Sequence, residues 1–138
     1  MRILGLDVGS RRIGVAVSEV ADVVVPVCVI NRSPREMEQI AAMVRERDIE
    51  LVVVGLPTGR NGEIGPQARA VLEFVEALRS VLKIPVETWD ESFTTAEAEE
   101  LLIEADLSRA KRRRVLDAAA AVILLQSYLE SVRSKRSG

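Results

Sequence analysis

The sequence predicts an α/β fold built on a five-stranded mixed sheet with helices on both faces. The first 30 residues hold three apolar, strand-like runs whose gaps are too short for a helical crossover. After them, strand-like and amphipathic helical segments follow one another, which gives the order βββαβαβαα around a central first strand. At 138 residues the chain can build one core, so we expect a single domain over residues 1–133 and a frayed tail at 134–138.

The three N-terminal runs predict an antiparallel meander and cover residues 2–8, 13–18 and 23–30. A helix start follows at Ser33, Pro34 and Glu36. Serine is a favoured cap, proline suits the first helical position, and glutamate three residues after the cap completes a capping box. We therefore expect a helix from residue 34 onward.

The second half of the chain alternates between strands and helices. Residues 51–55 form a continuous apolar run, as is typical of a central parallel strand covered on both faces. A glycine-rich loop at 56–65 follows, which is as consistent with a plain connection as with a phosphate-binding loop, because it lacks the P-loop pattern. The remaining expected elements are a helix at 66–82, a strand at 84–89 and helices at 94–105 and 113–131.

Three carboxylates stand beside or inside apolar sequence. Asp7 lies within the first strand-like run, Glu91 follows the fifth, and Asp117 precedes an apolar helical stretch. A lone buried carboxylate is costly unless a positive charge compensates it. Ligands in parallel-sheet folds bind where the carboxyl ends of neighbouring strands meet, so Asp7 and Glu91 should reach one edge. These acids predict a site for a hard divalent cation, Mg²⁺ or Mn²⁺.

Each acid also has a structural interpretation. Asp7 could bind the amides of the following turn, Glu91 could be a solvated strand end, and Asp117 could be a charge favoured near the start of a helix. The three together favour the metal site over these separate explanations.

Composition excludes several other chemistries. The chain contains no histidine, which removes Ser-His-Asp and Cys-His nucleophiles and an imidazole base. Its single cysteine, Cys28, lies in an apolar run and is expected to be a small core residue, with no disulfide, as suits a reducing cytoplasm. No apolar run approaches the roughly 20 residues of a membrane span, so we expect a cytoplasmic protein with no membrane partner.

Positive charge is unevenly distributed, although the net charge is only −2. The basic run from Arg109 to Arg114 stands just before Asp117, and a basic pair follows Asp7. Such runs are usually solvated surface, but beside a candidate site they are also able to hold phosphates. The candidate phosphate-binding residues are Arg11, Arg12, Lys111, Arg113 and Arg114.

Four motifs together resemble the YqgF family, also called RuvX. They are Asp7-Val8-Gly9-Ser10, the segment from Val54 to Ala68 with Leu56-Pro57, Gly62 and Gly65-Pro66-Gln67, Asp90-Glu91-Ser92-Phe93-Thr94-Thr95, and Asp117 with Ala120-Ala121. The resemblance covers nearly the whole chain in the right order. It implies the ribonuclease H-like fold that the family shares with the RuvC resolvases.

The resemblance also implies a function. It suggests a metal-dependent nuclease that processes the 5′ end of pre-16S ribosomal RNA, with Asp7, Glu91 and Asp117 as the family's acidic triad. Structured precursor rRNA would be the partner, with ribosomal particles as further candidates, and the protein would be a monomer or weak homodimer. One position departs from the family, which commonly has arginine after the glutamate where this chain has Ser92.

Three other functions fit parts of the pattern. A Holliday-junction resolvase would use the same acids on DNA. A non-catalytic nucleic-acid-binding scaffold would bind RNA equally well without Mg²⁺. A nucleotide-binding ATPase is suggested by Asp7-x-Gly9-Ser10, but that fold needs two such domains and this chain has length for one.

Overall fold

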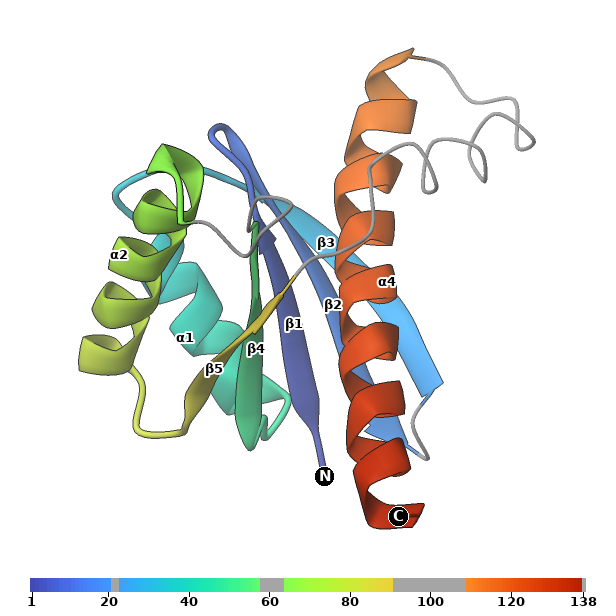
Figure 1. Cartoon of the computed structure of the whole chain (residues 1–138). Coiled ribbons are helices and arrows are strands. Elements are labelled where there is room, and N and C mark those ends of the chain that lie inside the picture. The colour runs from blue at the N-terminus through green and yellow to red at the C-terminus, as the bar shows by residue number, and fades with distance from the viewer. Residues whose placement is uncertain (21–22, 58–63, 91–108, 138) are drawn as a thin grey trace.

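The structure is a computed structural model of the chain. It describes the backbone of residues 1–20, 23–57, 64–90 and 109–137, and the side chains of these residues outside 109–117 and 134–137. The predicted α/β fold is confirmed: one five-stranded sheet has the strand order β3-β2-β1-β4-β5, and helices cover both of its faces (Figure 1).

The strands pair as the sequence predicts. β1 (Ile3–Val8), β2 (Arg12–Val20) and β3 (Val23–Asn31) form an antiparallel meander. β4 (Leu51–Leu56) runs parallel to β1, and β5 (Val86–Asp90) runs parallel to β4. β1 is therefore central. The carboxyl ends of β1, β3, β4 and β5 lie at one edge of the sheet, which we call the carboxyl edge.

The helices divide between the two faces of the sheet. α1 (Glu36–Glu46) and α2 (Pro66–Val81) pack on one face, and the long α4 (Arg109–Ser137) crosses the other (Figure 1). All three helices begin at the carboxyl edge and run back across the sheet. The helix expected at 94–105 lies outside the described residues. Within the described ranges, no helix is long and apolar enough to cross a membrane.

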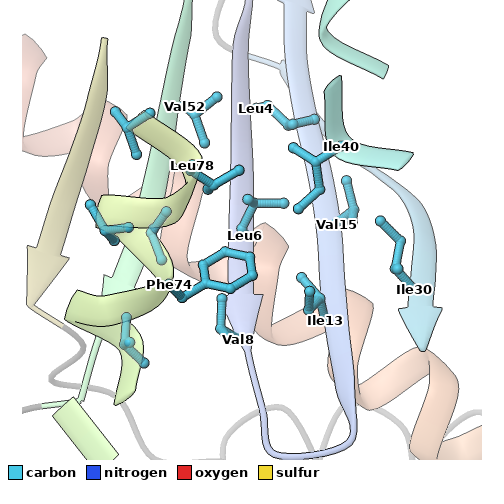
Figure 2. Close-up of a cluster of buried hydrophobic side chains, with 14 of the residues drawn as sticks. Leu4, Leu6, Val8, Ile13, Val15, Ile30, Ile40, Val52, Phe74 and Leu78 are labelled. Atoms are coloured by element: carbon cyan, nitrogen blue, oxygen red, sulfur yellow. The ribbon is translucent and has the colours of Figure 1, made fainter. Parts of the chain in front are cut away.

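The main core fills the space between the sheet and helices α1 and α2. Alternate residues of β1, namely Leu4, Leu6 and Val8, point into it together with Phe74 of α2 (Figure 2). Leu4 and Leu6 are fully buried. Burying a leucine side chain contributes about 1.5–3 kcal/mol, so this face supplies most of the apolar stabilisation of the sheet.

The predicted capping box of α1 is wrong. The helix begins at Glu36, its N-cap is Arg35, and the cap residue makes no side-chain hydrogen bond to the helix. The Ser33 hydroxyl oxygen instead accepts a hydrogen bond from the Arg35 amide at 3.2 Å. The Glu36 carboxylate accepts a hydrogen bond from Nε of Arg32 at 2.8 Å. In a capping box this carboxylate would accept a hydrogen bond from the Ser33 amide instead.

Two further expectations differ from the structure. Cys28 is exposed rather than buried, because β3 is an edge strand and the sequence alone does not reveal that position. α4 runs from Arg109 through Ser137, beyond the expected 113–131 and into the segment that we expected to be a tail. No glycine or proline occurs between these ends, so nothing in the sequence stops the helix before Gly138.

Candidate active site

Asp7 lies on the α4 side of β1, near the carboxyl edge. Successive side chains of a strand point to opposite faces, and Leu6 and Val8 face the α1 and α2 core. Ile3, on the other face, packs with Leu125 of α4. Asp7 therefore shares its face with Ile3 and Gly5, and it is half-buried. Leu6 and Val8, the apolar residues on either side of Asp7, face the opposite way, which explains how a carboxylate can stand in this run.

Gly5 brings α4 close to β1. A Cβ atom on Gly5 would lie 3.1 Å from Cβ of Leu125 and 3.5 Å from the carbonyl oxygen of Ala121. A Cβ contact of 3.1 Å is shorter than an ordinary van der Waals contact, so glycine permits this close approach of helix to strand. Sequence analysis did not single out Gly5, although a glycine inside a strand-like run is a known signal for such an approach.

The same packing places the backbone of Asp117 near the level of Asp7. α4 runs antiparallel to β1, so that both chain termini lie at the same end of the molecule (Figure 1). From the contact between Gly5 and Ala121, Asp7 lies two residues further along β1, about 6.6 Å. Asp117 lies four residues earlier on the helix, about 6 Å in the same direction. The backbone of Asp117 therefore lies at about the same level as Asp7, near the carboxyl edge.

β5 is fixed to the same helix by two polar contacts. Nε1 of Trp89 donates a hydrogen bond to the Ser127 hydroxyl at 3.2 Å, and the Trp89 and Tyr128 rings meet edge to face at 5.7 Å. The Tyr128 hydroxyl donates to the Glu87 carboxylate at 2.8 Å. Glu87 and Trp89 therefore lie on the α4 side of β5. Glu91 is two residues beyond Trp89 and falls outside the described residues.

These contacts change the acidity of Tyr128. Burial of the ring, the hydrogen bond to Glu87 and the negative charge of that carboxylate together raise the pKa of Tyr128 to about 12. The phenol therefore stays protonated at neutral pH and is a fixed donor to Glu87. Its role is to hold β5 against α4 rather than to transfer protons.

The turn after Asp7 is held by a network that the sequence did not indicate. The Gly9 amide donates to the Arg12 carbonyl oxygen at 2.8 Å, which closes the β1–β2 turn. Nη1 of Arg32 donates to the Gly9 carbonyl oxygen at 2.7 Å. A Cβ atom on Gly9 would lie 2.9 Å from the Arg12 carbonyl oxygen, so the turn requires glycine. Arg32 thereby fixes the segment that follows Asp7.

The predicted phosphate-binding residues lie around this edge. Arg11 is exposed in the β1–β2 turn, and Arg12 begins β2 and is half-buried. Lys111, Arg113 and Arg114 occupy the first two turns of α4, with side chains outside the description. These residues belong to the start of α4, at the carboxyl edge (Figure 1).

The donor set suits a hard cation. Asp7, Glu91 and Asp117 offer only carboxylate oxygens, the ligands that Mg²⁺ and Mn²⁺ prefer, and the chain has no histidine to attract a softer metal. Among the described residues no group of three or more potential ligands comes together. Asp7 is the only predicted ligand whose side chain lies within that part of the chain.

A groove of about 750 Å³ lies between β3 and α4, next to this edge. Ala118 and Ala119, directly after Asp117, line one end, and residues of β3 from Pro26 to Asn31 line the opposite wall. The lining is mostly apolar and does not include Asp7. The described residues of the lining include no carboxylate, and we place the candidate site at the carboxylates beside the groove.

Known proteins match this chain over nearly its whole length. The family model described as "RuvX: Holliday junction resolvase" matches residues 1–131. A protein of Caldanaerobacter subterraneus subsp. tengcongensis named "Putative pre-16S rRNA nuclease" is 49% identical, with 97% of this chain and 99% of that protein covered. A protein of Thermoanaerobacter pseudethanolicus with the same name is 45% identical, with 98% and 100% covered.

Solved structures of resolvases share the fold. T. thermophilus RuvC in complex with a Holliday junction substrate superposes with a TM-score of 0.60 at 16% identity, covering 97% of this chain and 96% of that one. The Fowlpox virus resolvase bound to Holliday junction DNA gives 0.60 at 14% identity, covering 96% and 99%. At these identities the likeness concerns the ribonuclease H-like fold.

Proposed function

Because the chain belongs to the RuvX family, we propose that it is a nuclease that hydrolyses phosphodiester bonds in precursor 16S rRNA, at the 5′ end of the mature sequence. The observation that supports the proposal most is Asp7, half-buried on the α4 side of the central strand of a ribonuclease H-like sheet, where α4 packs closely on β1 at Gly5. The names of the full-length relatives supply the substrate.

We assign the metal ligands as Asp7, Glu91 and Asp117, with two Mg²⁺ or Mn²⁺ ions as the cofactor. Divalent ions, when bound, activate water for attack and stabilise charge on the leaving 3′ oxygen. The protein would hold and orient them: Asp7 extends from a buried central strand, and the Gly5 contact keeps α4 close enough for Asp117 to share the site. Without cations the carboxylates would repel one another.

Arginine and lysine side chains would hold the substrate. Arg11 and Arg12 lie four and five residues after Asp7, and the basic run of α4 begins at the same edge. Guanidinium groups bind phosphate through two parallel hydrogen bonds, which fixes the strand while the carboxylates act on one bond. The absence of arginine at Ser92 makes these residues the candidates for that task.

A second substrate is a four-way DNA junction. The matching family model is described as a Holliday junction resolvase, and two fold relatives were solved with junction DNA. The acids and the cofactor would be the same, and the nucleic acid would differ.

The experiment is a cleavage assay of the purified protein on precursor 16S rRNA and on a four-way DNA junction. Each substrate is tested with Mg²⁺, with Mn²⁺ and with EDTA, and Asp7→Asn serves as the control for a contaminating nuclease. We expect metal-dependent cleavage of the RNA at a defined position. Cleavage of the junction alone would favour the resolvase, and RNA binding without cleavage under any condition would favour a non-catalytic scaffold.

A further inference from the structure

Two loops meet at the carboxyl edge beside Asp7. One is the β1–β2 turn that carries Arg11, and the other is the connection from β3 to α1 that carries Arg35. The amide of Arg32 donates to the Arg11 carbonyl oxygen at 2.9 Å, and Arg12 is paired with Asn31 in the sheet. The two loops are therefore neighbours in a defined register.

Arg32 joins these loops through its side chain. Its Nη1 donates to the Gly9 carbonyl oxygen at 2.7 Å, and its Nε donates to the Glu36 carboxylate at 2.8 Å. Its guanidinium also lies 5.3 Å from the centre of the Phe74 ring. All of these partners belong to the protein, so Arg32 fixes the loops rather than offering its charge to a ligand.

Arg11 and Arg35 differ from Arg32 in this respect. Both are exposed. Neither side chain makes a hydrogen bond or ion pair with any residue of the described ranges. Two guanidinium groups thus stand on loops whose relative position Arg32 has already fixed. Such prearrangement lowers the entropic cost of binding a ligand through both groups.

We propose that Arg11 and Arg35 form one phosphate-binding surface, which holds the RNA backbone at the carboxyl edge. The proposal rests on the nuclease function above and adds Arg35, which sequence analysis did not identify, as a substrate contact. A polyanion fits this surface because phosphate oxygens accept the paired hydrogen bonds of a guanidinium. The other end of the sheet differs, because there Arg47 pairs with Glu19 at 2.8 Å.

The test compares two double variants that remove the same charge. Arg11→Gln/Arg35→Gln removes the proposed surface. Arg45→Gln/Lys83→Gln removes two exposed cations near the opposite edge, at the end of α1 and before β5. Binding of labelled precursor 16S rRNA is measured in EDTA, where cleavage does not interfere, at several salt concentrations. All four side chains are exposed, so we expect thermal midpoints close to that of the wild type.

We expect Arg11→Gln/Arg35→Gln to weaken RNA binding roughly tenfold or more at low salt and to flatten the slope of log affinity against log salt by about two. The Arg45→Gln/Lys83→Gln control should follow the wild type. A third variant, Arg11→Lys/Arg35→Lys, should retain the salt slope because it keeps both charges, while losing part of the affinity with the paired geometry.

Equal slopes and affinities for the wild type and Arg11→Gln/Arg35→Gln would overturn the proposal, and so would an equal loss in the control. The outcome is separable from that of the nuclease function. If the wild type cleaves no substrate but Arg11→Gln/Arg35→Gln weakens RNA binding, the phosphate-binding surface is supported and the nuclease function is not. If the wild type cleaves RNA and Arg11→Gln/Arg35→Gln binds RNA as tightly as the wild type, the nuclease function is supported and the surface is not.

Discussion

The two faces of strand β1 perform different tasks. Leu4, Leu6 and Val8 point toward α1 and α2 and belong to the large apolar core (Figure 2). Ile3, Gly5 and Asp7 lie on the α4 face, where the apolar cluster is smaller and polar contacts join α4 to β5. In the proposed function, alternation along one strand places core residues on one face and the candidate metal ligand on the other. Substitutions on neighbouring residues should therefore have very different consequences.

The largest effect is expected for Asp7→Asn, which should abolish cleavage and preserve the fold. The variant keeps the shape of the side chain and removes one anionic ligand, which should reduce kcat by on the order of a thousandfold or more. Single-turnover cleavage of precursor rRNA in Mg²⁺ measures the loss. The thermal midpoint in EDTA is the control that the variant is folded.

Cleavage at near-normal rates by a folded Asp7→Asn protein would contradict the proposed role of Asp7 as a metal ligand. A second readout concerns the ion itself. Mg²⁺ that binds only the folded site raises the thermal midpoint of the wild type by mass action, and Asp7→Asn should lose most of that increase.

Leu6→Ala, one residue away, should do the opposite. Leu6 is fully buried in the core between the sheet and helices α1 and α2. Its truncation leaves a cavity and should lower the free energy of unfolding by about 2–5 kcal/mol. Denaturant titration measures this loss. At a temperature where both proteins are folded, kcat should stay within a few-fold of the wild type, and a thousandfold drop would show that the two faces are not separable.

Gly5→Ala tests the α4 face without touching a charged group. The added methyl would lie 3.1 Å from Cβ of Leu125 and 3.3 Å from its Cδ2, so the helix must move by a few tenths of an ångström. Overpacking of this kind costs about 1–3 kcal/mol. Because the contact sets how closely α4 packs on β1, and Asp117 of α4 is a proposed ligand together with Asp7 of β1, we expect kcat to fall more than stability alone explains.

The double variant Gly5→Ala/Leu125→Gly is the matched control for Gly5→Ala. It removes both the Cβ and the Cδ2 atoms that the added methyl would crowd and should restore part of the activity, although it loses apolar packing and helix propensity. An activity that does not recover would mean that the methyl acts on something other than the separation of strand and helix.

Periodicity predicted the fold because it depends on local patterns. The alternation in β1 and the continuous apolar run of β4 are each readable without knowledge of distant residues. The edge position of β3, which exposes Cys28, depends on which strands become neighbours. The failed capping box of α1 depends on Arg32, which binds Glu36 at the start of that helix and Gly9 in the distant β1–β2 turn.

The candidate site divides in the same way. Asp7 was identifiable because a carboxylate is unusual in an apolar run, whereas Arg32 and Gly5 were not, because their importance comes from contacts with Gly9 and Leu125 that are distant in sequence. Nothing in the sequence distinguishes Arg35 from other arginines. Only the fold brings the loop that carries it beside the turn that follows Asp7. Glu91 lies outside the described residues, and its role stays a prediction.

The smallest effect is expected at Tyr128 of α4, whose hydroxyl donates a hydrogen bond to Glu87 of β5. Its pKa is raised from 10.0 to about 12, first by burial, then by the hydrogen bond to Glu87 and the charge of that carboxylate. The contribution of Tyr128 to stability should be fully present below pH 10 and should be lost as the pH rises toward 12, because the unfolded phenol ionises first. Tyr128→Phe should remove this alkaline loss. At neutral pH it should cost about 1 kcal/mol or less, since the ring still packs against Trp89 and only an exposed hydrogen bond is gone.

Denaturant titrations of the wild type and Tyr128→Phe between neutral pH and the alkaline range test this prediction. Curves for the wild type and Tyr128→Phe that fall in parallel above pH 10 would show that the Tyr128–Glu87 contact does not contribute to holding β5 against α4.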